Sequence, residues 1–172
     1  MRILKYLVVS ASMIIALSVW AQAQSSASSG ERKEHRGQGY VFFAPGAIVK
    51  EGYSVATAHF GGGGEAFLYK GLGLGAEAGY VTSWQNFGNG VGLVSFNGSY
   101  HFNRDRKLSP FVSGGYTLGF RSDTANLFNF GGGVNYWFRD RVGLRLEFRD
   151  HVYSEQSLNI HYLGGRIGFS FR

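Results

Sequence analysis

Three features of the sequence predict an all-β fold, an eight-stranded antiparallel up-and-down transmembrane β-barrel. Apolar side chains alternate with small or ionic ones in the last third of the chain, and a period of two is typical of strands. Each alternating segment has about ten to twelve residues, the length that a tilted strand needs to cross a bilayer. The chain also begins with a secretion signal. The residues expected to face outward in the last third are Phe128, Phe130, Gly132, Val134, Tyr136, Phe138, Val142, Leu144, Leu146, Phe148, Leu163, Gly165, Ile167, Phe169 and Phe171.

The N-terminus predicts export. Arg2 and Lys5 precede an apolar run at 7–20, and the small-x-small sequence at 21–23 is a cleavage site. The run is about 14 residues long, shorter than the roughly 20 residues of a spanning helix, so cleavage after Ala23 is favoured over a retained anchor. The next residues are polar and aperiodic. The predicted domains are a signal peptide at 1–23, a flexible leader at 24–38 and an outer-membrane β-barrel at 39–172.

The composition supports a barrel and excludes several other classes. The 172 residues include 27 glycines and no cysteine, which excludes disulfides, thiol chemistry and a lipid anchor on cysteine. The formal net charge is +6, and without Arg2 and Lys5 of the signal it is +4; this charge is mild and dispersed, so we expect no nucleic-acid partner. The polar face of the strands is mainly Gly, Ser, Asn and Thr. Such a face is too small and too poor in charge for a soluble surface, but it fits the narrow interior of an eight-stranded barrel.

Turn signals divide the chain after the leader into eight predicted strands. Their ranges are 39–49, 57–69, 72–82, 91–102, 108–120, 127–138, 142–152 and 160–171. The connections alternate between short charged turns and longer mixed loops. The short turns are at 70–71, 103–107 and 139–141, and the longer loops are at 50–56, 83–90, 121–126 and 153–159. In an outer-membrane barrel, short turns face the periplasm and long loops face outward. Pro45 lies inside the first strand and leaves its orientation open.

Six charged residues are predicted to form a network in the lumen. If Leu72 and Leu74 face lipid, the alternation points Glu77 inward. Glu65 joins it if the connection at 70–71 has three residues, whereas a two-residue turn would point Glu65 outward. The remaining predicted members are Arg145, Glu147, Arg149 and Arg166. Three acids and three arginines form a neutral set, and buried charges require partners. The network either plugs the barrel or rearranges to admit ions, and the narrow interior favours the plug.

Aromatic residues are expected to form two girdles at the lipid headgroups. The members expected at the periplasmic rim are Tyr40, Tyr100, Phe102, Phe111, Tyr136, Phe138, Phe169 and Phe171. The members expected at the outer rim are Phe60, Tyr80, Trp84, Phe120, Phe128 and Tyr153.

Five segments resemble strands of the small bacterial outer-membrane β-barrel family. They lie at 71–80, 110–116, 131–138, 142–149 and 165–171. After the leader, the whole chain is similar to the porin-like, eight-stranded transmembrane domain of outer membrane protein A. This resemblance implies a location in the cell outer membrane and insertion by the barrel-assembly machinery. It also implies an assembly signal at Phe169 and Phe171, although Arg172 after the last aromatic departs from the usual form.

The predicted function is a structural or surface-interaction role as a monomer among outer-membrane lipids, with at most minor passage of solutes or ions. One alternative is a soluble periplasmic lipocalin-like carrier, which needs an apolar cavity. Another is an outer-membrane lipid-modifying hydrolase that uses His151, Ser154 and Glu155. His151 and Ser154 differ by an odd number, so on a strand they point to opposite faces. We therefore expect no enzyme activity. The histidines lack metal-ligand spacing, so we expect no metal and no cofactor.

Overall fold

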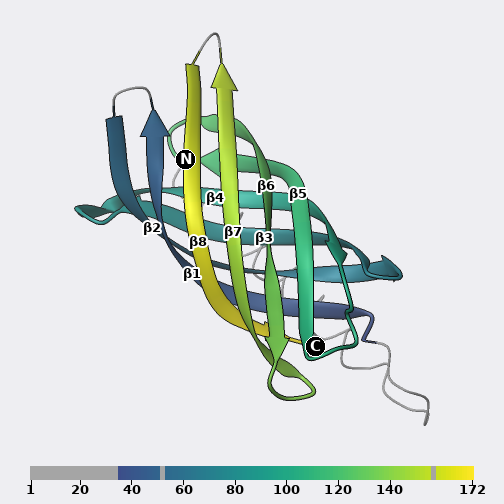
Figure 1. The fold of residues 1–172 in the computed structure, drawn as a ribbon. Helices are drawn as coiled ribbons and strands as arrows, with labels where there is room; N and C mark the ends of the chain where they lie inside the picture. Colours follow the sequence, from purple (N-terminus) through teal and green to yellow (C-terminus); the bar gives the residue numbers. More distant parts are fainter. Residues whose placement is uncertain (1–34, 51–52, 156–157) are drawn as a thin grey trace, which may run out of the picture.

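The computed structural model describes residues 35–50, 53–155 and 158–172, and these residues form a closed barrel of eight antiparallel strands in chain order (Figure 1). The strands are β1 (Gly37–Lys50), β2 (Tyr53–Tyr69), β3 (Leu72–Ser83), β4 (Asn86–His101), β5 (Leu108–Phe120), β6 (Thr124–Trp137), β7 (Val142–Glu155) and β8 (Leu158–Phe171). The predicted fold class is confirmed. The predicted signal peptide at 1–23 lies outside the described residues, as does the leader up to residue 34. Among the described residues, no helix is long and apolar enough to span a membrane.

Pairing between β1 and β8 closes the sheet. The ladder runs from Gly39 opposite Phe171 to Val49 opposite His161, so the sheet has no free edge. The pairing is interrupted at Pro45, which has no N–H to donate, and resumes at Gly46 in the same register. Pro45 lies on the outward face, which settles the orientation that the sequence left open. β1 begins at Gly37, two residues before the predicted start of the barrel.

The two ends of the barrel differ in their connections. We call the end with connections 70–71, 102–107 and 138–141 the turn end, and the opposite end the loop end. The predicted long loops at the loop end are wrong. The ladders continue to Lys50 opposite Tyr53 and to Glu155 opposite Leu158, so the β1–β2 and β7–β8 hairpins project at the top of Figure 1. Polar residues in these segments keep their backbone hydrogen bonds and extend the strands.

The β2–β3 connection decides the orientation of Glu65. Lys70 and Gly71 form a two-residue turn in which both φ angles are positive, 36° and 93°, as a tight hairpin requires. Such a turn alone would point Glu65 outward. A β-bulge between Phe67 and Tyr69 inserts one extra residue, so Glu65 pairs with Gly75 and faces the lumen.

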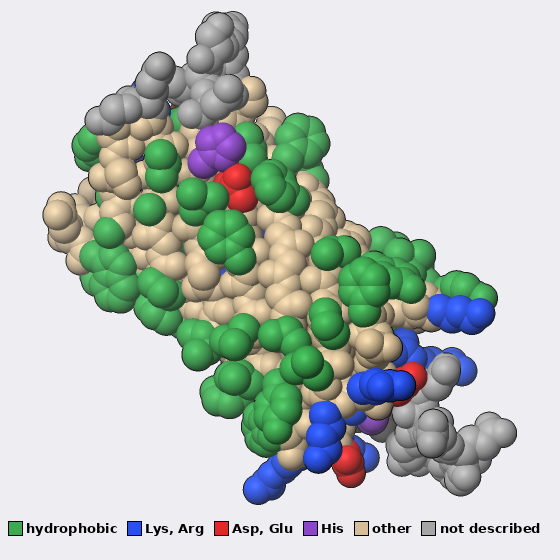
Figure 2. Space-filling model, in the orientation of Figure 1, with side chains coloured by type: hydrophobic (Ala, Val, Ile, Leu, Met, Phe, Trp, Pro, Cys, Tyr) green, Lys and Arg blue, Asp and Glu red, His purple; other side chains and the backbone are tan. Residues whose placement is uncertain are grey.

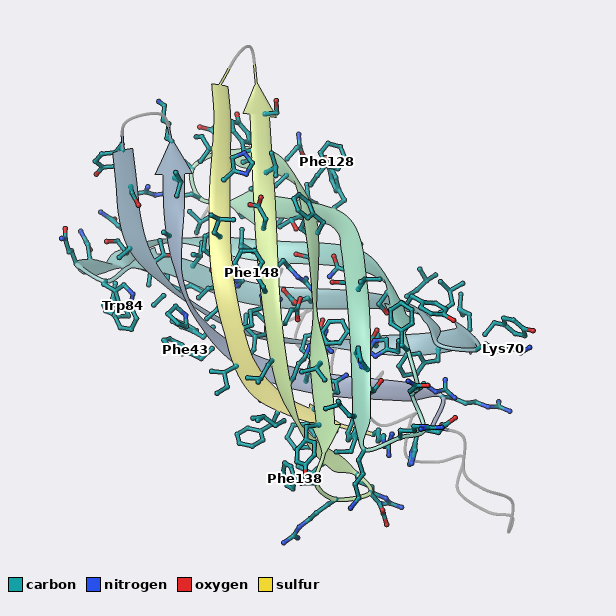
Figure 3. All side chains as sticks on the ribbon, viewed as in Figure 1. Phe43, Lys70, Trp84, Phe128, Phe138 and Phe148 are labelled. Carbon is teal, nitrogen blue, oxygen red and sulfur yellow. The ribbon has the colours of Figure 1, made fainter. Side chains whose placement is uncertain are left out.

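The outward face of the barrel is apolar on every strand. Figure 3 shows the labelled side chains of Phe43, Phe128 and Phe138 pointing away from the barrel, and Phe148 is 57% exposed. Exposed representatives of the eight strands, in chain order, are Val41, Phe60, Leu74, Phe96, Val112, Phe130, Phe148 and Ile167. Figure 2 shows hydrophobic side chains spread over the visible wall, with Lys and Arg gathered at one end. This polarity is the inverse of that in a soluble protein.

Two aromatics expected in the girdle lie inside the barrel instead. Tyr40 is 6% exposed and Phe111 is 2% exposed. The sequence of β1 is apolar at both parities around Tyr40, so alternation does not define its outward face. Both rings are drawn inward by polar partners in the lumen, where the Tyr40 hydroxyl donates to Glu77 and the Phe111 ring contacts Arg145.

Candidate functional site

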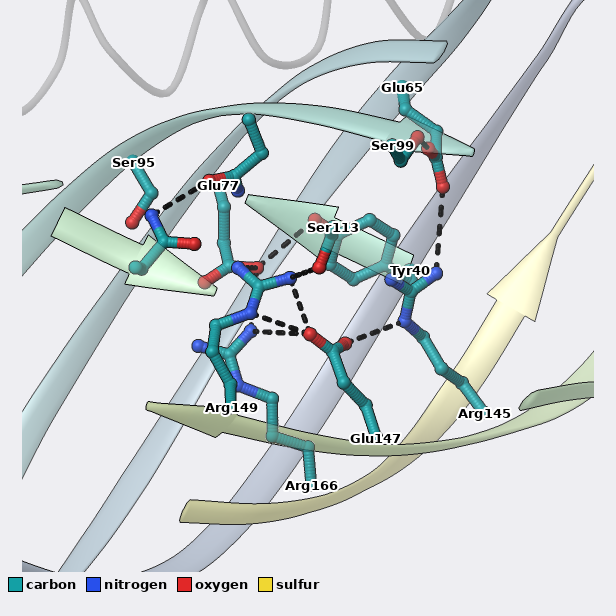
Figure 4. A network of polar contacts seen from close by, with 12 residues as sticks. Tyr40, Glu65, Glu77, Ser95, Ser99, Ser113, Arg145, Glu147, Arg149 and Arg166 are labelled. Carbon is teal, nitrogen blue, oxygen red and sulfur yellow. Dashed lines mark hydrogen bonds and ion pairs between the residues drawn. The ribbon is translucent and has the colours of Figure 1, made fainter. Parts of the chain in front are cut away.

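The structure places all six predicted network residues in the lumen and brings them together (Figure 4). Glu65 comes from β2, Glu77 from β3 and Arg166 from β8. The other three lie at alternate positions of β7, which projects them to one face. Their side chains are each at most 5% exposed. The lumen therefore holds three carboxylates and three guanidiniums with almost no access to solvent.

Two carboxylates form the centre of this network. Glu77 Oε2 accepts from Arg166 Nη1 at 2.8 Å, from the Tyr40 hydroxyl at 3.0 Å and from Arg149 Nη1 at 3.4 Å. Glu147 accepts from Arg145 Nε at 3.0 Å and from Arg149 Nε at 2.6 Å. Each buried acid thus faces two guanidiniums, which is the compensation that a buried charge needs.

Glu65 extends the network toward the turn end. Its carboxylate accepts from Ser99 and Gln38, lies 3.1 Å from His101 Nε2, and pairs with Arg145 Nη1 at 3.5 Å. Arg145 therefore bridges Glu65 and Glu147. A chain of charge-assisted contacts crosses the lumen from β2 to β8.

Aromatic rings support the arginines, a feature that the sequence analysis missed. The Arg145 guanidinium lies over the Tyr40 ring at 4.3 Å and over the Phe111 ring at 4.0 Å. Arg166 lies over the Phe42 ring at 4.2 Å. Cation–π contacts of this kind strengthen when they are desolvated. The sequence does not show that Tyr40 and Phe42 of β1 point inward, because apolar residues occupy both faces of this strand.

The charged lumen leaves little free space. The hollow bordered by Tyr40, Glu65, Arg145 and Arg149 measures about 10 Å³, room for at most one water molecule. A larger open hollow of about 500 Å³ lies on the outer wall, bordered by Val134, Leu146, Phe148 and Ile167 among others. The space near the network does not provide the apolar, ligand-sized cavity that a carrier requires.

A second cluster occupies the lumen nearer the loop end. The rings of His59, His151 and Tyr162 lie together, with centroid distances of 5.3 Å between His151 and Tyr162 and 6.4 Å between the two histidines. All four imidazole nitrogens are buried without a hydrogen-bond partner among the described residues. In the part of the chain that the structure describes, no three His, Asp or Glu side chains could hold a metal ion.

The structure does not bring together His151 and Ser154, two of the residues on which the hydrolase alternative depends. His151 is buried in the lumen, whereas Ser154 is exposed on the other face of β7, and the side chain of Glu155 lies outside the described residues. The odd spacing separates His151 from Ser154 as expected.

One polar pair on the outward face was missed. His161 Nδ1 lies 2.8 Å from Asp150 Oδ2, between neighbouring strands β8 and β7. The register between β7 and β8 sets Val152 opposite His161, with Asp150 two residues away on the same face, and the sequence does not mark that register.

The predicted assembly signal lies at the end of β8. Phe169 is outward and exposed, and Phe171 is half-buried. The Arg172 side chain folds back over the Trp137 ring at 4.1 Å, and its Nε donates to the Asp140 carbonyl. Both aromatics therefore stay in the strand despite the extra residue.

Comparison with known proteins gives likeness of fold. No protein-family model and no curated protein matches the chain. Neisserial surface protein A (NspA) is 13% identical, with 78% of this chain and 96% of that chain covered and a TM-score of 0.61. The N-terminal β-barrel domain of Pseudomonas aeruginosa OprF is 21% identical, with 78% and 99% covered and a TM-score of 0.53. The attachment invasion locus protein Ail of Yersinia pestis is 9% identical, with 78% and 97% covered and a TM-score of 0.52. The chain has the fold of the small outer-membrane β-barrels, which confirms the resemblance seen in its sequence.

Proposed function

We propose that this chain is an integral outer-membrane protein with a structural or surface-interaction role, and that its Arg–Glu network plugs the lumen. The observation that carries this proposal is the inverted polarity of the barrel. Large apolar side chains such as Phe96 and Phe148 are exposed on the wall, while Glu147 and Arg149 are buried inside. A soluble monomer rarely exposes an apolar surface that encircles the molecule, because such a surface drives association.

The plug follows from charge and space together. Six paired charges and three aromatic rings fill the middle of the lumen, and opening a path there would separate carboxylates from guanidiniums. Breaking one buried pair costs about 3–5 kcal/mol. We therefore expect a rarely conducting barrel, with passage of solutes or ions at most minor.

Insertion into a membrane is tested by extraction and gel migration. Purified membranes should retain the protein through carbonate washing, and the folded barrel should migrate differently from the boiled protein in a detergent gel. Spin labels at Leu146 and Glu147 test the orientation directly. A lipid-soluble oxygen probe should reach position 146 and not 147. The opposite accessibility, or release by carbonate, would favour a soluble carrier.

Planar bilayer recording tests the plug. The purified protein should give only small and infrequent current steps, and Glu77→Ala should increase their size or frequency because it frees Arg149 and Arg166 from a shared carboxylate. A large, stable conductance from the unaltered protein would contradict the plug without contradicting membrane insertion.

We further propose that the exported chain is inserted by the barrel-assembly machinery through Phe169 and Phe171, and that it stays a monomer. Replacing both aromatics with alanine should lower the amount of folded barrel in the outer membrane. The control pair Phe148→Ala and Phe130→Ala, which lies on the exposed wall outside the last strand, should lower it less. Equal losses would remove the special role of the last strand.

A further inference from the structure

The turn end carries a dense group of basic side chains, which we call the basic rim. Its members are Arg36, Lys70, Arg104, Arg106, Lys107, Arg139, Arg141 and Arg172. The acidic residues among them are Asp105 and Asp140. The connections of the loop end contribute much less charge, with Arg121 and Asp123 among the described residues. Figure 2 shows this gathering of Lys and Arg at one end. The barrel is therefore electrically asymmetric along its axis.

The basic rim combines anchored and available cations. Arg104 lies over the Phe67 ring at 4.7 Å, and Arg172 lies over Trp137. Arg106, Lys107 and Arg139 are exposed, and so is Arg141. Within the described ranges, none of these last four forms an ion pair. The ion pair that the rim does contain joins Arg104 to Asp105 at 3.9 Å. These four exposed cations therefore have no ion-pair partner among the residues that the structure describes.

The available cations lie next to exposed apolar side chains at the turn end. Lys107 precedes the exposed Leu108, and Arg139 follows the exposed Phe138. Figure 3 shows Lys70 at the tip of the β2–β3 hairpin and Phe138 on the wall. Aromatic residues of a barrel lie at the level of the lipid headgroups, and long basic side chains extend from there toward the phosphates. The basic rim is thus placed at phosphate depth in the proposed membrane orientation.

The pKa of His35, which lies near the basic rim, is lowered by burial and by the positive charges of the rim. Burial lowers the pKa of His35 below its usual value, and the cations Arg172, Arg141 and Arg104 lower it further, against the opposing charge of Asp105. His35 precedes the first strand and lies outside the membrane-spanning segments. Any bound anion near the rim would offset this field.

We propose that the basic rim is a binding surface for anionic phospholipid headgroups of the leaflet at the turn end. This inference rests on the proposed function, since it requires an inserted barrel. Arginine guanidiniums bind phosphate oxygens with paired hydrogen bonds, and lysine adds a mobile point charge. Each basic residue near an anionic surface strengthens binding by a factor of about five. Phosphatidylglycerol, which carries a net negative charge, should therefore be enriched around the turn end relative to zwitterionic phosphatidylcholine.

Spin-labelled lipids test this selectivity. The full barrel is reconstituted in phosphatidylcholine vesicles with a trace of spin-labelled phosphatidylglycerol or phosphatidylcholine, and electron paramagnetic resonance measures the motionally restricted fraction of each. We expect phosphatidylglycerol to be preferred about fivefold, and the preference to fall toward one in 1 M salt. Failure to insert into phosphatidylcholine would count against the proposed membrane barrel. Insertion with equal occupancy of the two lipids would overturn the rim proposal alone.

A charge-neutralised variant locates the surface. The combined change Arg106→Gln, Lys107→Gln, Arg139→Gln and Arg141→Gln should abolish the preference. The control Lys50→Gln with Arg121→Gln, near the loop end, should keep it. An unchanged preference in the first variant would refute the assignment.

A nuclear magnetic resonance titration of His35 in the unaltered protein gives a second readout, since phosphatidylglycerol should raise the His35 pKa above its value in phosphatidylcholine. If the two lipids occupy the barrel surface equally and the protein is retained on purified cell-wall polymer, the ligand of the basic rim is a wall polymer and the phospholipid proposal is refuted.

Discussion

Removing Arg149 from the lumen should destabilise the barrel strongly, and removing Glu147 with it should restore much of the loss. Arg149 is 1% exposed and contacts Glu147, Glu77 and Ser113. Arg149→Met leaves three buried carboxylates facing two guanidiniums, so one negative charge loses its compensation. Breaking a buried pair in this way costs about 3–5 kcal/mol of unfolding free energy. Glu147→Met creates the opposite excess at a similar cost.

The double variant keeps the lumen neutral. Glu77 still pairs with Arg166, and Glu65 still pairs with Arg145, while methionine fills the vacated volume. Replacing a buried ion pair by apolar groups of similar volume is often close to neutral. The double variant should therefore lose no more stability than either single variant. Two single costs of about 3–5 kcal/mol each and a double variant that costs no more than one of them give a coupling energy of at least about 3 kcal/mol.

Urea unfolding in lipid vesicles, followed by tryptophan fluorescence, measures all three variants. The control is Leu146→Met, which lies next to Glu147 on the lipid-facing side and should change stability by less than about 0.5 kcal/mol. Single variants that each cost under about 1 kcal/mol would contradict the reasoning, because the charges would then be solvated rather than buried. Strict additivity in the double variant would show that Arg149 and Glu147 do not compensate each other.

Three further predictions concern packing and protonation. His151→Phe should raise the urea midpoint, because burying unpaired imidazole nitrogens costs about 1–3 kcal/mol. A phenylalanine ring can keep the stacking on Tyr162, and a lowered midpoint would indicate that the imidazole binds a water or a ligand. Gly133→Ala should destabilise the barrel, since its Cβ would lie 2.1 Å from a backbone oxygen, whereas Gly165→Ala meets nothing within 4 Å and should be tolerated in the same urea titration. His35 should titrate below its usual pKa of 6.5, so the folded state should lose stability as the pH falls below 6.5, because the unfolded chain then binds the proton more readily. Arg141→Gln should raise the His35 pKa in a nuclear magnetic resonance titration, and an unchanged pKa would contradict the assigned field.

Alternation identifies the outward face of a strand where the large apolar residues occupy every second position. For this reason the sequence predicts that Arg145, Glu147 and Arg149 point inward, and all three are buried in the lumen. Alternation gives no answer where both parities are apolar, as around Tyr40 in β1. It also cannot reveal a bulge, so the orientation of Glu65 depended on an irregular pairing that no local sequence signal marks.

Contacts across the lumen require more than the face of each strand. Glu77 and Arg166 are 89 residues apart, and they meet because barrel closure and strand tilt set them at one height. Period two predicts that both point inward, but it does not predict their height along the axis. The outward pair of Asp150 and His161 was missed for a related reason. Its partners share a face, yet only the register of the β7–β8 hairpin makes them neighbours.

The distribution of charge also bears on the direction of insertion. A lysine or arginine at the centre of a bilayer costs about 2–4 kcal/mol in a barrel, so the end with fewer charges crosses more easily. The basic rim would carry eight cations across, whereas the connections of the loop end carry few charges. The lumen charges can cross as compensated pairs, with Glu77 held by two arginines. The loop end should therefore cross the membrane first, and the turn end should stay on the side from which insertion starts. This orientation places the basic rim against the phospholipids of that leaflet.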